Sequence, residues 1–156
     1  VEGKGEMEAF LTDGLRSLLD TIPAQDMAEY TVRWPGHIQR YIDEKRSGKL
    51  DTESLILDWK FNINRPEFTW MEVKVECENG ESFHWTIEDH GGTDGSSMAR
   101  TTGLVTSSCV TEWVNSENII EEGSYPPEIL SDIVISSIVQ TMKDSGVDIR
   151  GPDIQL

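Results

Sequence analysis

Two neighbouring segments in which apolar and polar residues alternate constrain the fold of this chain more than any other feature. Their apolar positions are Met71, Val73, Val75 and Cys77 in the first segment, and Phe83, Trp85 and Ile87 in the second. A period of two is that of a β-strand with one apolar face. The sequence therefore predicts two antiparallel strands that share one apolar face and one charged face.

The loop between these strands sets their register. Residues 78–80 read Glu-Asn-Gly, and a three-residue loop with Gly80 in the left-handed conformation places Val75 opposite Phe83. A two-residue Asn-Gly loop would instead place Val75 opposite His84 and mix the two faces. We therefore expect the three-residue loop with a glycine bulge, and helices that cover the apolar face.

Similar patterns predict the other elements. We expect strands over residues 2–10, 26–34 and 147–149, a short helix between Asp13 and Pro23, and helices over residues 36–46, 51–59, 96–115 and 127–143. No Gly-x-Gly-x-x-Gly follows a strand, so the chain encodes no dinucleotide-binding fold. The predicted class is α+β, a mixed and largely antiparallel sheet with helices packed on one face. We expect a single domain over residues 1–150 and a tail over 151–156.

Composition and charge exclude several partners. The formal net charge is −16, which argues against nucleic acid and anionic membranes because a phosphate backbone needs a basic surface. No apolar run approaches the ~20 residues of a membrane span, and no charged-then-apolar leader opens the chain. Cys77 and Cys109 fall on apolar faces, so we expect buried free thiols and a cytoplasmic location. Asp89, His90 and Asp94 match no standard ligand spacing, so we expect no metal.

Residues 97–103 (SMARTTG) are small and hydroxyl-bearing residues around one arginine, at the start of a predicted helix. Small residues there allow a ligand to approach the free N–H groups of the first turn. Arg100 adds a planar set of donors that suits a carboxylate or phosphate. The alternative is structural, since Ser and Thr are ordinary caps at a helix start.

Three segments each place an arginine where a strand or loop meets a helix: residues 12–16 (TDGLR), 33–37 (RWPGH) and 97–103 (SMARTTG). With the blocks AFLTDGLR (9–16) and PPEIL (126–130), they occur in an order that resembles the C-terminal domain of the saccharopine dehydrogenase-like family. The resemblance covers residues 2–150. The family includes saccharopine reductase, lysine 6-dehydrogenase and carboxynorspermidine dehydrogenase.

The resemblance implies an NAD(P)-dependent oxidoreductase that transfers hydride at a carbon–nitrogen bond of an amino-acid-type substrate. In this family an N-terminal Rossmann domain binds NAD or NADP, and the second domain closes the substrate cleft and forms a homodimer. The chain starts at Val1 inside an expected strand, so we expect the Rossmann domain to precede it in a longer parent. We expect this fragment alone to bind no cofactor and to be inactive.

The candidate site residues follow from these segments. We assign substrate binding to Arg33, Arg100, Ser97, Thr101 and Thr102, and a catalytic role to His37. The two arginines are expected to converge on one anion pocket, because a substrate carboxylate favours a bidentate guanidinium. His37 could donate to substrate or relay a proton near neutral pH.

Each assignment has a structural alternative. Arg33 could form a cross-strand ion pair with Glu29, His37 could bond to backbone at its helix start, and Arg16 could be a surface charge. The alternative function is a non-catalytic assembly or ligand-binding module that retains the fold, because a fold alone does not assign an activity.

Overall fold

The predicted hairpin forms with the expected register. In the computed structural model, β3 (Thr69–Glu76) pairs antiparallel with β4 (Ser82–Asp89), and Val75 lies opposite Phe83. Gly80 has φ +85° in the loop, a conformation that costs a glycine nothing sterically. The N–H of Cys77 donates to the carbonyl of Glu81 at 2.8 Å, which closes the hairpin around the three-residue loop. The prediction of this loop is confirmed.

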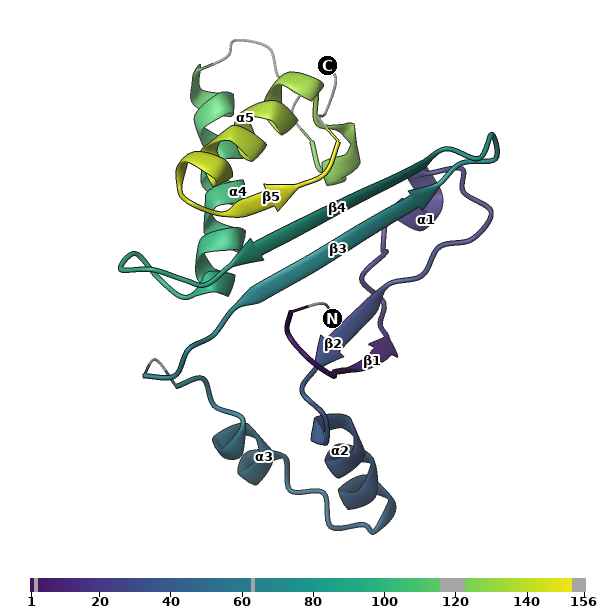
Figure 1. The fold of residues 1–156 in the computed structure, drawn as a ribbon, viewed down its shortest axis with the longest axis vertical. Helices are drawn as coiled ribbons and strands as arrows, with labels where there is room; N and C mark the ends of the chain where they lie inside the picture. The colour runs from purple at the N-terminus through teal and green to yellow at the C-terminus, as the bar shows by residue number, and fades with distance from the viewer. Residues whose placement is uncertain (2, 63, 116–122, 153–156) are drawn as a thin grey trace. The chain divides into compact units, whose positions relative to one another are not determined.

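The structure describes residues 1, 3–62, 64–115 and 123–152, and they divide into two units, Val1–Phe61 and Asn62–Leu156 (Figure 1). Both units contain antiparallel strands and helices, so the α+β class is confirmed. The strands form two separate sheets, a two-stranded one and a three-stranded one. The single domain over residues 1–150 stays a prediction, and most of the predicted tail lies outside the described residues.

The second unit is built on the three-stranded sheet, in the order β3-β4-β5. Its other elements are α4 (Ser97–Asn115), the 3₁₀ turn η1 (Pro127–Ile129), α5 (Asp132–Asp144) and β5 (Asp148–Arg150). Apolar residues of α5 and the start of β5 form its core: Val134, Ile138, Met142 and Val147, with Ile87, Leu104, Val105, Cys109, Leu130 and Ile149 packed against them. Removal of these side chains from water drives α4 and α5 together beside the sheet.

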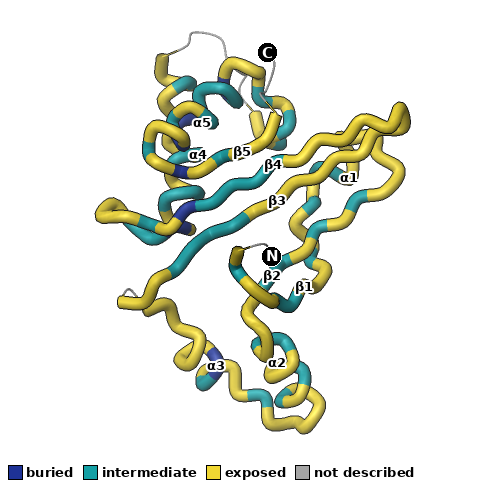
Figure 2. Tube along the Cα trace, in the orientation of Figure 1, coloured by how far each residue is buried: buried dark blue, intermediate teal, exposed yellow. Residues whose placement is uncertain are grey.

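Helices cover only one end of the apolar face of the hairpin. Ile87 packs against the core, whereas Met71, Val73 and Val75 remain 48%, 42% and 42% exposed (Figure 2). The helices therefore cover only the part of the apolar face around Ile87, because the hairpin extends beyond them. Cys77 was expected to be buried and is exposed for the same reason, while Cys109 is half-buried at the core.

The first unit contains the two-stranded sheet and three short helices. Its elements are β1 (Glu8–Leu11), α1 (Leu18–Thr21), β2 (Tyr30–Arg33), α2 (His37–Arg46) and α3 (Thr52–Asp58). β1 and β2 pair antiparallel, with Glu8 opposite Arg33. The Asp51 side chain caps α3 by accepting from the N–H groups of Glu53 and Ser54, and Leu55 is buried.

Several predicted elements are shorter than expected. The strands expected over 2–10 and 26–34 begin only at Glu8 and Tyr30, and the helix expected from Asp13 begins at Leu18. Arg16 has φ +42°, so the helix cannot run through it.

The helix expected over 127–143 is interrupted after its first turn. Leu130 has ψ 137°, and this extended residue separates the 3₁₀ turn from α5.

Candidate functional site

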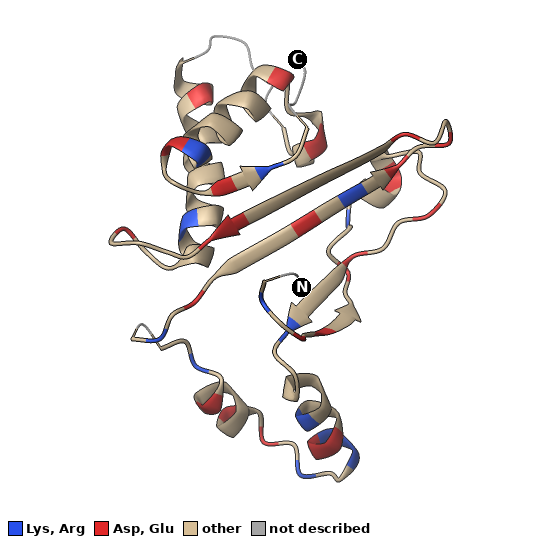
Figure 3. Cartoon of the chain, viewed as in Figure 1, with Lys and Arg blue, Asp and Glu red and all other residues tan. Residues whose placement is uncertain are grey.

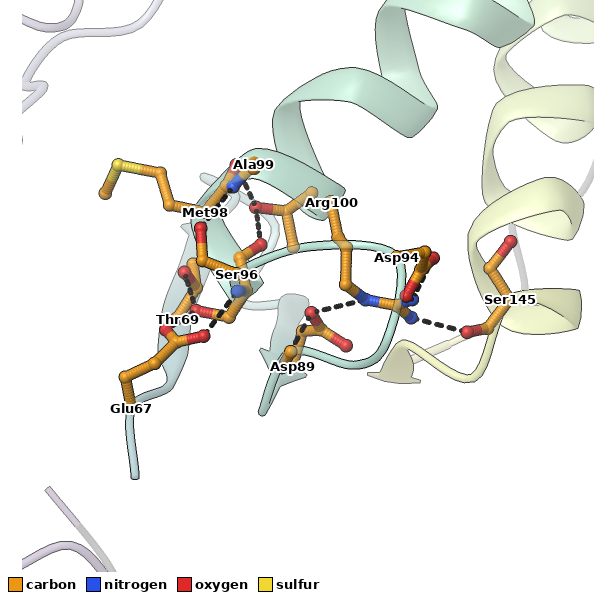
Figure 4. Close-up of polar contacts among 12 residues, drawn as sticks. Glu67, Thr69, Asp89, Asp94, Ser96, Met98, Ala99, Arg100 and Ser145 are labelled. Carbon is orange, nitrogen blue, oxygen red and sulfur yellow. Dashed lines mark hydrogen bonds and ion pairs between the residues drawn. The ribbon is translucent and has the colours of Figure 1, made fainter. Parts of the chain in front are cut away.

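A carboxylate of the chain itself holds the first turn of α4. The N–H of Ser97 donates to Glu67 Oε1 at 2.6 Å, and the Ser97 hydroxyl bonds to Glu67 Oε2 (Figure 4). Thr69 Oγ1 lies 2.7 Å from Ser97 Oγ, and Ser97 is fully buried. A negative charge at a helix start is stabilised by the free N–H groups and the helix dipole. The N–H of Ser97, which the sequence pattern offers to a ligand, therefore already donates its hydrogen bond to Glu67.

Arg100 connects three segments of the second unit. Its Nε donates to Asp89 Oδ2 at 3.0 Å, its Nη1 pairs with Asp94, and its Nη2 donates to the carbonyl of Ser145 at 2.6 Å (Figure 4). Asp89 ends β4, Asp94 lies on the following loop, and Ser145 follows the last residue of α5. Arg100 thus joins the start of α4 to the end of the sheet and to the carbonyl end of α5.

The charges of this group support one another. Asp89 first, and then Asp94, raise the pKa of the Arg100 guanidinium above its ordinary value through side-chain hydrogen bonds. The same guanidinium lowers the pKa of Asp94. The Arg100 and Asp89 side chains are only 9% and 4% exposed, whereas that of Asp94 is 57% exposed. Asp94 is therefore the partner that solvent reaches most easily.

A cleft of about 500 Å³ opens beside Arg100. It is lined by Glu88, Asp89, His90, Gly91, Gly92, Thr93, Asp94, Arg100, Ser145, Gly146 and Asp148. Figure 3 shows acidic residues at the end of β4, on the loop after it and on β5, and basic positions at the start of α4, at the end of α5 and on β5. The cleft thus offers one guanidinium among several carboxylates.

Gly91 lets the loop after β4 pass close to the start of α4. Its φ is +72°, and an added Cβ would lie 2.6 Å from Glu67 Oε1 and 3.1 Å from the backbone N of Ser97. Only glycine fits both the conformation and the space. The loop after β4 is therefore packed against the Ser97–Glu67 contact.

The two predicted threonines of α4 differ in their contacts. The Thr101 hydroxyl donates to the carbonyl of Ser97 at 2.9 Å, within its own helix. Thr102 is exposed, with its carbonyl accepting from the Thr106 hydroxyl. Ser97, Thr101 and Thr102 lie together at the start of α4 with Arg100, as the sequence predicted.

Arg33 and His37 belong to the first unit. Arg33 ends β2 and is exposed, with Nη1 donating to the carbonyl of Val32 at 2.8 Å. His37 is the first residue of α2, and its ring centroid lies 5.2 Å from that of Trp59 at an interplanar angle of 64°. Because Arg33 and Arg100 lie in different units, their convergence on one anion pocket stays a prediction.

The alternative partner of Arg33 is engaged elsewhere. Glu29 accepts from the Thr12 hydroxyl, and from the N–H of Gly14 at 3.3 Å. Arg33 and Glu29 form no ion pair among the contacts of the described residues.

The residues that the sequence missed are the partners of α4. Glu67 lies outside every predicted helix and strand, and its only signal is its place between Pro66 and the first strand residue. Asp89 and Asp94 were considered as metal ligands and instead bind Arg100. Across the described residues, no group of three or more His, Cys, Asp or Glu side chains could hold a metal ion.

No family model matches the chain, and no curated protein matches it. Among the helices of the described ranges, none combines the length and the apolar character needed to cross a membrane.

Proposed function

We propose that this chain is the substrate-binding and dimerisation domain of an NAD(P)-dependent oxidoreductase of the saccharopine dehydrogenase-like type. The substrate is an amino-acid-type molecule, and the reaction is hydride transfer at its carbon–nitrogen bond. The nicotinamide supplies the hydride chemistry, and the chain binds and orients the substrate. The ordered blocks AFLTDGLR, RWPGH, SMARTTG and PPEIL support the family, and a Rossmann domain outside this chain holds the cofactor.

One observation carries the choice of substrate class: the cleft at the start of α4 combines Arg100 with several carboxylates. An amino acid carries one carboxylate and at least one ammonium group. A guanidinium suits the first by paired hydrogen bonds, and Glu88 and Asp148, which also line the cleft, suit the second by charge. A dicarboxylate would meet repulsion from the same walls.

Asp94 has the properties of a stand-in for the substrate carboxylate. It pairs with Nη1 of Arg100, its side chain is 57% exposed, and it lies on a loop bounded by Gly92 and Gly95. A substrate carboxylate that replaces Asp94 would keep Arg100 paired, while Asp89 and the Ser145 carbonyl continue to orient the guanidinium. Arg100 is then a binding residue, and Asp89 a positioning residue.

Arg33 and His37 lie in the first unit, and their roles stay part of the proposal. Arg33 is exposed and keeps its assignment to substrate binding, and His37 is the candidate acid or base. Ser97 and Thr101 act by holding the α4 start, whereas the exposed Thr102 contacts substrate directly.

A second function is favoured by one observation. Arg100 bonds at Nε, Nη1 and Nη2 to groups of its own chain, which is what a purely structural arginine does. In that case the chain is a non-catalytic assembly module, and the cleft binds no amino acid.

Titration of the chain with L-lysine, followed by amide NMR, separates the two functions. The control ligand is 1,5-diaminopentane, which has the same two amines without the carboxylate. We expect lysine to shift the amides of residues 91–95 and of Ser145, and we expect the diamine to shift them less. The Asp94→Asn variant should bind lysine several-fold more tightly, because the competing charge on Arg100 is removed.

The matched control is Asp43→Asn, an exposed carboxyl on α2. Equal responses to both ligands, or no response, would support the assembly module. Tighter binding in both variants would show that Asp94 does not compete at Arg100.

A further inference from the structure

β3 is an edge strand in the unit Asn62–Leu156. The sheet order is β3-β4-β5, so within the described part of this unit no strand pairs with the outer side of β3. The N–H of Cys77 bonds to Glu81, directly after the last ladder pair. Bonded and non-bonded pairs alternate along an antiparallel ladder, so odd-numbered residues of β3 bond to β4. Even-numbered residues, 70 to 76, direct their N–H and C=O groups outward.

The side chains along this edge have a symmetric order. Glu72, Lys74 and Glu76 lie on one face, and Met71, Val73 and Val75 lie on the other. The Lys74 side chain is 63% exposed, and the apolar row is uncovered by the helices. Exposed edge strands of this kind are templates for pairing with another strand.

We propose that β3 pairs antiparallel with β3 of a second copy, about a two-fold axis at Val73. In this register Glu72 lies opposite Lys74 of the partner subunit, and Lys74 lies opposite Glu72 of the partner subunit. On the other face, Met71 meets Val75 of the partner subunit and Val73 meets its own equivalent. The even-numbered residues of both strands face each other and form the bonded pairs, as the alternation in each sheet requires.

Charge excludes the neighbouring registers. An axis at Lys74 places two lysines opposite each other and sets Glu72 against Glu76, and an axis at Glu72 pairs two glutamates. An axis at Val75 matches Lys74 with Glu76, but it sets Glu72 against Glu78, which lies in the hairpin loop. Only the axis at Val73 combines opposite charges with overlap along most of the strand.

The occupant is a second copy because the edge is complementary to itself. Two-fold dimers use the same surface on both subunits, and the order Glu-x-Lys satisfies that condition when it is read in opposite directions. This inference rests on the dimerisation part of the proposed function and names the surface that performs it. It is independent of substrate binding in the cleft beside Arg100.

Charge reversal tests the register through the oligomeric state. We expect sedimentation of the full chain, from about 1 µM to about 200 µM, to show a monomer–dimer equilibrium. Lys74→Glu and Glu72→Lys should each raise the dimer dissociation constant at least about tenfold, because each change turns two attractive pairs into repulsive ones. The control Lys49→Glu, an exposed reversal outside β3, should leave the constant unchanged.

The two single variants are complementary to each other. The charged residues on this face of the edge are all acidic in the Lys74→Glu chain, and the Glu72→Lys chain gains a second lysine there. Their equimolar mixture should form a heterodimer, and the double variant Glu72→Lys/Lys74→Glu should dimerise as the unmodified chain does. A variant that merely fails to fold would not be rescued by mixing.

Cross-linking locates the axis. In a Cys77→Ser/Cys109→Ser background, Val73→Cys should form an intermolecular disulfide, because non-bonded antiparallel partners have Cα atoms about 4.5 Å apart. Val75→Cys should cross-link less. The proposal would be overturned if Val75→Cys cross-linked faster than Val73→Cys. It would also be overturned if the chain stayed monomeric at every concentration, or if neither charge reversal changed the dimer dissociation constant. A dimer that uses another surface would leave the proposed substrate binding intact.

Discussion

At the residue scale, the start of α4 depends on groups that leave no room for substitution. Ser97 is fully buried between Glu67 and Thr69, and Gly91 passes within contact distance of the same carboxylate. These contacts fix the first turn of α4, and with it the position from which the Arg100 side chain projects. Gly91 therefore constrains the site although it has no functional side chain.

We predict that Gly91→Ala destabilises the fold by about 2 kcal/mol, since the new Cβ meets Glu67 and the backbone is left-handed. The matched control is Gly103→Ala, within α4, where an added Cβ meets nothing within 4 Å. That change should stabilise the fold by about 0.5–1 kcal/mol. Urea unfolding measures both, and equal effects would contradict the packing of Gly91.

The Asp94–Arg100 pair predicts a pH dependence with a definite sign. Arg100 lowers the pKa of Asp94 in the folded state, so the pair stabilises the fold above the ordinary value of 3.8. This contribution is lost as the pH falls through the folded-state pKa. We predict that Asp94→Asn lowers the melting temperature near neutral pH and that the difference closes in acid.

Thermal unfolding between about pH 6 and about pH 2 measures that difference, and added salt should reduce it because Asp94 is exposed. A difference independent of pH would show that the ionised pair does not stabilise the fold.

At the element scale, the hairpin shows how far sequence reasoning reaches. The register that places Val75 opposite Phe83 follows from two local facts, the period of two and Gly80 in the loop. The helix start at Ser97 was also predicted within one residue. Local patterns therefore suffice where each element is long and strongly periodic.

The errors occur where one residue interrupts a pattern that otherwise continues. Arg16 with φ +42° shortens the first helix, and Leu130 with ψ 137° separates the 3₁₀ turn from α5. Cys77 lies on an apolar face that no helix reaches. These outcomes depend on tertiary context rather than on local propensity.

The candidate site was predicted only in part for a similar reason. The SMARTTG segment was recognised, but the partners of Arg100 come from β4 and from the turn after α5, at sequence separations of 11 and 45 residues. No pattern of residue spacing in the sequence connects Arg100 with Asp89 or with Ser145. Asp89 was noticed only as a possible metal ligand.

The cap of α3 gives a prediction for a single element. Asp51 accepts from the N–H groups of Glu53 and Ser54, both at 3.1 Å. Asp51→Ala should destabilise the Val1–Phe61 unit by about 1 kcal/mol, whereas Asp51→Asn should cost only a few tenths because the acceptor oxygen remains. Hydrogen exchange of the α3 amides measures the change. Equal protection in both variants would contradict the capping role.

At the scale of the whole molecule, the proposal divides the work between this chain and a cofactor domain outside it. The sequence has no glycine-rich turn of the dinucleotide-binding type, and carboxylates outnumber the one guanidinium in the lining of the cleft beside Arg100. A pyrophosphate would be repelled from such a surface. The proposal therefore assigns this chain to the substrate rather than to the cofactor.

We therefore predict that the chain alone shows no measurable NAD(H) or NADP(H) binding by isothermal titration calorimetry. The control is L-lysine under the same conditions, which should give a signal that Asp94→Asn strengthens. Micromolar binding of either nicotinamide cofactor would overturn the assignment of the cofactor site to another domain.

The most direct measurement is a crystal structure of the complete gene product with reduced cofactor and a bound amino acid. The account predicts a substrate carboxylate within hydrogen-bonding distance of Arg100 Nη1, with Asp94 displaced and Asp89 still bonded to Nε. An amino acid bound elsewhere, with Arg100 still paired to Asp94, would contradict it.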